Sequence, residues 1–222
     1  QGMIAADNEL SINANKIDNQ KNGVIAAGDL LTINASGDVE NAAVISSNEA
    51  LNIKAQNLNN NSAALIFAQN LSVNATENLK NSGQIYGQNE LKIIAKNLEN
   101  IGKNSLISGV NNNEINIALA LENEGEISSS KKIIVKANSL NNKKDAVIIS
   151  LDDLEVLTAV SLTNNGNIFA KDNSSVTAQS LVNEEFGAIN SNQNNLTITQ
   201  NLTNFGDILA GLELKIIAES LN

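Results

Sequence analysis

The chain is built from copies of one unit, of which the clearest is Leu202-Thr203-Asn204-Phe205-Gly206-Asp207-Ile208-Leu209-Ala210-Gly211-Leu212-Glu213-Leu214-Lys215-Ile216-Ile217-Ala218. The unit has Leu at its start, Asn two residues later, Gly at four, Ile at six and a small residue at eight. Leu, Ile and Ala follow at twelve, fourteen and sixteen. The skeleton recurs from ten starting positions: Ile17, Val39, Leu58, Leu79, Leu98, Leu121, Leu140, Leu162, Leu181 and Leu202. Units of 19 residues alternate with units of 21 to 23, so the superperiod is about 41 residues.

Apolar residues alternate within each unit, which is the spacing of a β-strand. Leu214, Ile216 and Ala218 point one way, while Lys215 and Ile217 point the other. Gly and polar turns separate three such strands per unit and leave no room for a helix. A unit this short buries its apolar side only by stacking on the next unit. We therefore expect an all-β chain, with residues 1–222 forming a single right-handed parallel β-helix of about ten to eleven coils and three short strands per coil. A leucine-rich-repeat horseshoe is the alternative, because its period overlaps.

Composition excludes several functional classes. The chain has no Cys, no His and no Arg, so thiolate metal sites, nucleophile–base pairs and guanidinium clamps are unavailable. Its net charge of -10 argues against nucleic acid as a partner. The adjacent pairs Asp152-Asp153 and Glu184-Glu185 would point to opposite sides of a strand and are interpreted as solvated turn charges. We expect no catalytic residue, no metal site and no cofactor.

The first residues fall in the middle of a unit, with Ile4, Leu10, Ile12 and Ala14 at its later positions. We therefore interpret the chain as an internal fragment of a longer protein. It has no window of roughly 20 apolar residues of the kind that crosses a bilayer as a helix.

An asparagine stands two residues after the start of every complete unit: Asn19, Asn41, Asn60, Asn81, Asn100, Asn123, Asn142, Asn164, Asn183 and Asn204. Such a row could bind a ligand, or it could form a column of amides that satisfy one another and the turn carbonyls inside the coil. We favour the structural ladder, because a binding site does not require ten copies.

Two rows of small residues indicate tight turns. One row precedes the Ile by two residues and is assigned to Gly23, Ala43, Ala64, Gly83, Asn104, Gly125, Ala146, Gly166, Gly187 and Gly206. The other follows the Ile by two residues and alternates among Ala, Ser and Gly. Every second unit carries extra residues between its Asn and its Ile, so we expect alternate coils to bulge along one edge, where charged residues could contact a partner.

The residue after each Ile should point outward. Phe67 then lies beside Tyr86 of the next coil, and Ile149 lies beside Phe169. Clustered outward apolar groups can mark a contact surface, or they can pack only against their stacked neighbours. We name Phe67, Tyr86, Ile149 and Phe169 as the candidate contact face, although packing between neighbours is the favoured interpretation.

The units Leu79-Lys80-Asn81-Ser82-Gly83-Gln84-Ile85-Tyr86-Gly87 and Leu162-Thr163-Asn164-Asn165-Gly166-Asn167-Ile168-Phe169-Ala170 resemble the haemagglutinin repeats of the filamentous-haemagglutinin family. The resemblance covers essentially the whole chain. It implies a right-handed parallel β-helical filament in a two-partner-secretion exoprotein, either an adhesin or a contact-dependent growth-inhibition protein, on the surface of a Gram-negative bacterium. Several long units depart from the motif, and the unit from Leu140 to Ser161 has no Gly.

The implied partners are neighbouring repeats of the same longer chain and an outer-membrane transporter. A receptor or glycan on a host or bacterial cell is left open as a third. The expected role is a non-catalytic stalk. The competing hypothesis is a carbohydrate-active β-helix enzyme or a glycan-binding module.

Overall fold

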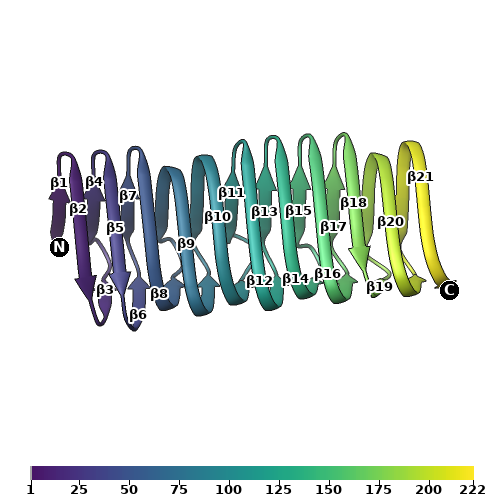
Figure 1. The fold of residues 1–222 in the computed structure, drawn as a ribbon, viewed down its shortest axis with the longest axis horizontal. Coiled ribbons are helices and arrows are strands. Elements are labelled where there is room, and N and C mark those ends of the chain that lie inside the picture. The colour runs from purple at the N-terminus through teal and green to yellow at the C-terminus, as the bar shows by residue number, and fades with distance from the viewer. Residues whose placement is uncertain (1) are drawn as a thin grey trace.

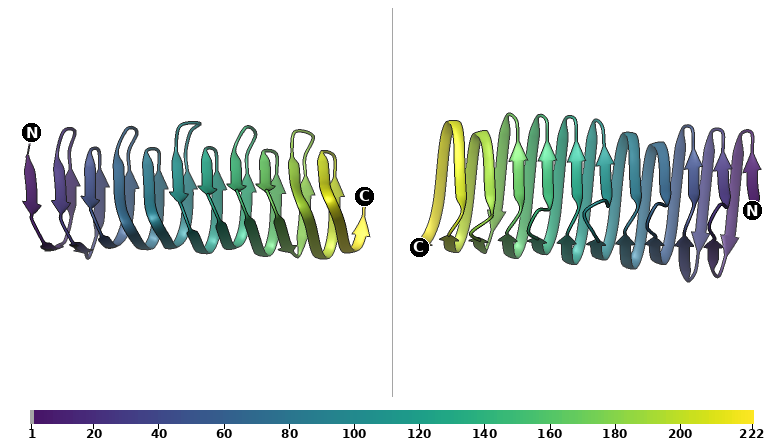
Figure 2. Two further views of the ribbon diagram at one scale, coloured as in Figure 1. Left: turned by 90° about the horizontal axis from the view of Figure 1, so that it is seen from above. Right: turned by 180° about the vertical axis from the view of Figure 1, so that it is seen from behind.

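The computed structural model describes residues 2–222, which form twenty-one β-strands wound into about eleven stacked coils (Figure 1). In Figure 1 the strands nearest the viewer run downward and those behind run upward as the chain advances from left to right. This sense of winding is right-handed, and the reverse view in Figure 2 agrees. Over the described residues there is no helix long and apolar enough to cross a membrane. The predicted parallel β-helix is confirmed.

Each coil contributes one segment to each of three parallel sheets. The first sheet contains β1 (Met3–Ala6), β4 (Val24–Ala27), β7 (Val44–Ser47), β11 (Leu106–Gly109), β13 (Glu126–Ser129), β15 (Val147–Ser150) and β17 (Asn167–Ala170). The second contains β2 (Glu9–Ala14), β5 (Leu30–Ala35) and β18 (Asn173–Ala178). The third contains β3 (Ile17–Asn19), β6 (Asp38–Asn41) and β19 (Ser180–Asn183).

The remaining strands run through more than one sheet. Four pass from the second into the third: β8 (Ala50–Asn60), β12 (Asn112–Asn123), β14 (Lys132–Asn142) and β16 (Asp153–Asn164). Four others extend from the first sheet onward: β9 (Leu65–Asn81), β10 (Gln84–Asn100), β20 (Ala188–Asn204) and β21 (Asp207–Leu221). The segments therefore merge in many coils. The corners bend through shifts of register, such as the one between Ala95 and Leu98, and pairing with the next coil resumes directly after each shift.

The register of the sheets places equivalent residues of successive units on top of one another. Ile85 pairs with Ile66 in the coil before and with Ile107 in the coil after. Leu98 likewise pairs with Leu79 and Leu121. These side chains are buried, so the core is a set of continuous Leu, Ile and Ala rows along the axis. Each unit covers the apolar side of its neighbour, which explains why one unit cannot fold alone.

The structure corrects one position in the row before the Ile. Ser105, and not Asn104, occupies that position: Ser105 is buried and its carbonyl accepts from the backbone N–H of Glu126 in the next coil. Asn104 is exposed. The loop from Ile101 to Leu106 is one residue longer than its counterparts, so the turn takes up one more residue before the strand begins.

Every second coil carries a longer loop along one edge, as the taller turns in the left panel of Figure 2 show. Each of these loops is closed by a backbone hydrogen bond across three residues, for example from Ala146 N–H to Lys143 O at 3.0 Å. Asn22, Ala63 and Asp145 have positive φ angles within them. A hydrogen bond joins Lys103 to Asp145 at 3.2 Å, so alternate loops touch across the shorter coil between them.

Candidate functional site

The ten asparagines of the repeat lie in one continuous column inside the coil, at the end of the third sheet. The Nδ2 of each donates to the Oδ1 of the next, and all nine links measure 2.8 or 2.9 Å. From Asn41 to Asn183 the column is fully buried, with at most 1% of any of these residues exposed.

From Asn19 to Asn183, each column amide also donates to a backbone carbonyl of the first sheet in the next coil. Asn123 Nδ2, for example, donates to Asn142 Oδ1 at 2.9 Å and to the carbonyl of Val147 at 3.1 Å. Its Oδ1 accepts from Asn100 Nδ2 at 2.8 Å and from the backbone N–H of Gly125 at 3.3 Å. Because both amide hydrogens and the oxygen are used, no polar group of Asn123 is free to bind a ligand. This geometry has the properties of a structural ladder.

The four residues of the candidate contact face lie on the outer side of the first sheet. Tyr86 pairs with Phe67 and Phe169 with Ile149 in register. The Phe67 and Tyr86 rings stack, with centroids 5.8 Å apart and planes inclined by 13°. All four side chains are half-buried, and the residues on either side of each one in its strand are buried. The rings therefore cover one another and still present an edge to solvent.

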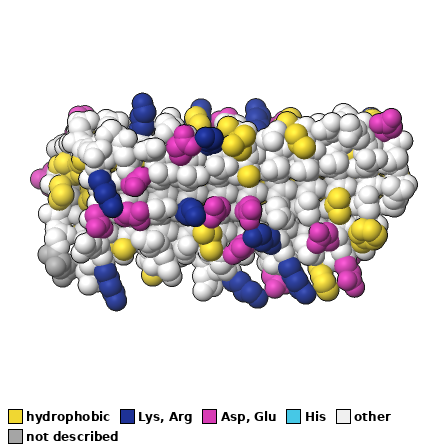
Figure 3. All heavy atoms as spheres, turned by 90° about the horizontal axis from the view of Figure 1, so that it is seen from below, with side chains coloured by type: hydrophobic (Ala, Val, Ile, Leu, Met, Phe, Trp, Pro, Cys, Tyr) yellow, Lys and Arg dark blue, Asp and Glu magenta, His cyan; other side chains and the backbone are white. Residues whose placement is uncertain are grey.

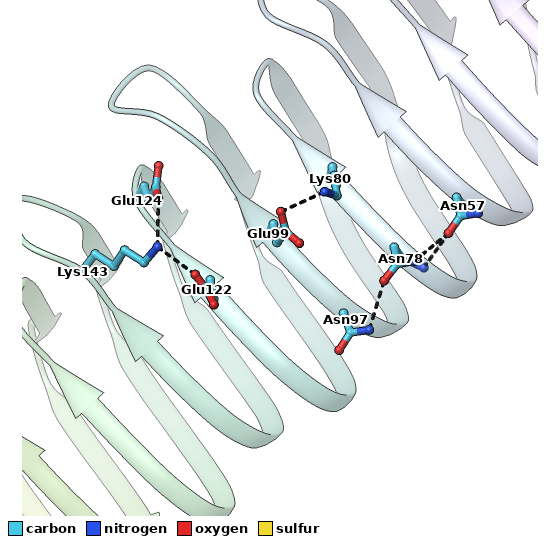
Figure 4. Close-up of polar contacts among 8 residues, drawn as sticks. All are labelled: Asn57, Asn78, Lys80, Asn97, Glu99, Glu122, Glu124 and Lys143. Carbon is cyan, nitrogen blue, oxygen red and sulfur yellow. Dashed lines mark hydrogen bonds and ion pairs between the residues drawn. The ribbon is translucent and has the colours of Figure 1, made fainter.

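Polar side chains on the outer side of the third sheet and on the loop edge beside it contact one another between coils (Figure 4). Lys80 Nζ lies 3.2 Å from Glu99 Oε2 on neighbouring coils. At the corner between the second and third sheets, a shorter amide column runs from Asn57 through Asn78 to Asn97. Repetition of the unit thus stacks surface side chains as well as core side chains.

Lys143 forms the densest ionic contact, 2.8 Å from a carboxylate oxygen of Glu122 and 3.0 Å from one of Glu124. The hydrogen bond from Lys143, followed by that from the backbone N–H of Gly102, holds the pKa of Glu124 below its usual value. The hydrogen bonds to Glu122 and then Glu124 raise the pKa of Lys143. More than a third of each of these side chains is exposed, so the pairs contribute modestly to stability.

Acid is expected to weaken this contact as Glu124 becomes protonated. A carboxyl group with a lowered folded pKa stabilises the fold above the unfolded pKa of about 4.3, and that contribution is lost as the pH falls through the folded pKa. Glu124→Gln should therefore reduce the stability lost between neutral and acidic pH, by less than about 1 kcal/mol. Urea unfolding at both pH values measures the difference. Glu185→Gln is the matched control, since no described residue forms an ion pair with the Glu185 carboxylate. An equal effect of both substitutions would refute the assignment.

Within residues 2–222 no three acidic side chains converge as metal ligands would. A groove of about 620 Å³ crosses the outer side of the second sheet, and Lys136 is the only charged residue in its lining. Its apolar lining includes Ile94, Ala118, Leu157 and Ala159. It brings together no acid–base pair.

Sequence analysis missed three features that depend on neighbouring coils. The first is the corner amide column from Asn57 to Asn97, and the second is the ionic contact of Lys143 with Glu122 and Glu124. The third is a contact between long loops, in which Lys144 Nζ lies 3.6 Å from the centroid of the Phe186 ring in the next long loop. The sequence did contain a signal for this contact. Lys144 and Phe186 are 42 residues apart, close to the superperiod of about 41, so they fall in successive long loops on the same edge.

A sequence model of the haemagglutinin repeat matches residues 1–43, 41–83, 84–159 and 149–206. The chain belongs to the haemagglutinin-repeat family. The matches span most of the coils described above, and they confirm the resemblance to filamentous haemagglutinin drawn from the repeat motif. No curated protein and no solved structure matches the chain. Haemagglutinin repeats occur in secreted, surface-associated proteins and are generally non-enzymatic, which fits a structural, adhesin-like segment.

Proposed function

We propose that the chain is a non-catalytic shaft segment of a large secreted surface protein of this family, either an adhesin or a contact-dependent growth-inhibition exoprotein. It would stand on the outer surface of a Gram-negative cell, continuous with neighbouring repeats and exported through an outer-membrane transporter. The observation that carries the proposal is the asparagine column, whose nine links run from Asn19 to Asn204 without a break.

A shaft needs length, stiffness and solubility. Each coil adds the strand spacing of about 4.8 Å, and the in-register core rows join every coil to the next. Acidic and basic side chains are interspersed along the face shown in Figure 3. A net charge of -10 keeps such rods soluble.

Incubation of the chain with neutral and acidic polysaccharides tests the enzymatic alternative. We expect no increase in reducing ends over buffer for any substrate. Reproducible cleavage that disappears in an Asp152→Asn, Asp153→Asn variant would overturn the non-catalytic assignment. Retention of the same polysaccharides on immobilised chain distinguishes a glycan-binding module from a spacer, since a spacer retains none of them.

Antibodies raised against the chain test the proposed location. They should label intact cells that express the full-length protein as strongly as permeabilised cells. Labelling that requires permeabilisation would place the segment inside the cell and contradict the shaft proposal.

A further inference from the structure

The outer row of the first sheet alternates between pairs of small and pairs of bulky side chains. From β4 to β17 it reads small, small, bulky, bulky, small, small, bulky, bulky: Ala26, Ser46, Phe67, Tyr86, Ser108, Ser128, Ile149 and Phe169. The row is therefore a series of hollows and projections, each two coils wide. When the order of the row is reversed, every bulky pair falls opposite a small pair. The row therefore fits a second copy of itself that runs in the opposite direction.

The same face is poor in charge. Over the coils from β4 to β17, the outward residues beside this row include Val24, Val44, Leu65, Leu106 and Val147, and Glu126 is the only charged one. Elsewhere the acidic excess opposes contact between two identical chains. On the first sheet this repulsion is nearly absent, so a second copy of the chain is an admissible partner there.

We propose that two copies of the chain pair through the outer faces of their first sheets, with the rods antiparallel and the bulky pairs of each in the hollows of the other. A two-fold axis parallel to the strands, midway between the first-sheet segments at Tyr86 and Ser108, produces this arrangement. Tyr86 then faces Ser108 of the second copy, and Phe67 faces Ser128. By the same operation Ile149 faces Ser46 of the second copy, and Phe169 faces Ala26. All four residues of the candidate contact face are used.

The contact is small. Eight strands at about 4.8 Å spacing give a strip roughly 38 Å long and two outward side chains wide. Such a strip buries less than the roughly 1,200 Å² of a standard interface, so the pairing is weak and reversible in solution. Rods that carry many such coils would gain by repetition of the contact. The inference goes beyond the shaft role, and a chain that stays monomeric would leave that role intact.

Paired variants test the fit. The first, Phe67→Ser with Tyr86→Ser, removes the projections of one cluster. The second, Ser108→Phe with Ser128→Phe, fills the hollows opposite them. Sedimentation velocity over a concentration series should show association of the unchanged chain, and association weaker by about tenfold or more for each variant alone. A mixture of the two variants should recover association, because the filled hollows of one then face the shortened side chains of the other.

A matched control variant distinguishes loss of association from loss of folding. Ile94→Ser with Leu157→Ser makes the same kind of change on the outer side of the second sheet and should leave association unchanged. Far-ultraviolet circular dichroism and urea unfolding check that every variant is folded. If the Phe67→Ser, Tyr86→Ser variant acted only by removing the stack between the two rings, the variant would be less stable and mixing would not restore association. The proposal is refuted by a monomeric unchanged chain at high concentration, or by a mixture of folded variants that associates no better than either alone.

Discussion

Asn123→Leu is expected to lower the free energy of unfolding by about 3 kcal/mol or more, because it interrupts the asparagine column at its centre. The substitution leaves a buried amide hydrogen of Asn100 and the buried Oδ1 of Asn142 without partners. Each such group costs about 1 to 3 kcal/mol, and the larger leucine adds strain. Urea unfolding followed by circular dichroism measures the loss.

Two further asparagines serve as controls. Asn113 lies in the same strand, β12, and is 1% exposed. Its Nδ2 donates to the Ser128 carbonyl at 3.2 Å, but its Oδ1 has no partner and its row neighbours are Leu91 and Ile133. Asn113→Leu should leave stability unchanged or raise it by about 1 kcal/mol. Asn204→Leu, in the last link of the column, should cost less than Asn123→Leu, since Asn204 is half-buried. Equal losses at all three positions would show that the column contributes nothing beyond side-chain size.

Gly166→Ala is expected to cost about 1 to 3 kcal/mol. A Cβ at Gly166 would overlap the carbonyl oxygens of Ala146 and Lys143, both in the backbone of the preceding long loop. A Cβ at Gly83, Gly125 or Gly206 would likewise overlap the two equivalent carbonyl oxygens of its own preceding long loop. Because backbone atoms cannot rotate away as a side chain can, the strands must separate to admit the methyl group. Thermal and urea unfolding both report the loss.

The chain contains a natural control for that prediction. Ala43 occupies the equivalent position in another short coil, and the hydrogen bond beside it, from Val44 N–H to Gly23 O, is stretched to 3.3 Å. The counterpart next to Gly166, from Asn167 N–H to Ala146 O, measures 2.8 Å. Ala43→Gly should therefore be neutral within about 1 kcal/mol, since relief of the crowding offsets the entropy of glycine. A Gly166→Ala variant as stable as the unchanged chain would contradict the crowding.

Much of the fold was predictable because each unit repeats the same pattern of apolar, Asn and small residues. The alternation of Leu214, Ile216 and Ala218 indicates a strand, and the fixed Asn sets the phase of each coil. Stacking is then the only way in which units of about 20 residues can bury their apolar sides. A single periodic signal, read ten times, compensates for the weakness of each copy.

What the sequence did not predict depends on contacts whose geometry varies between coils. The assignment of Asn104 to the turn row was an error of counting, since the loop from Ile101 to Leu106 is one residue longer than its counterparts and the residue two before Ile107 is Ser105. The merging of strands around corners, as in β10, depends on register shifts that leave no mark in the pattern. The link between Lys143 and Glu122 requires side-chain conformations as well as stacking order. The outward position of Tyr86 and its place beside Phe67 followed from alternation and stacking order, whereas the angle of 13° between the two rings depends on side-chain conformations.

The central claim is that the number of coils sets the length of a continuous shaft. Deletion of residues 98–139 removes one long and one short unit and keeps the asparagines in phase. Spin labels attached to the substitutions Lys54→Cys and Thr197→Cys report the length. Both positions are exposed on the second sheet, and they lie seven coils apart. Double electron–electron resonance should give a separation of about 34 Å in the full chain and about 24 Å in the folded deletion variant. An unchanged separation, or a deletion that unfolds the chain while single ladder substitutions are tolerated, would contradict the account.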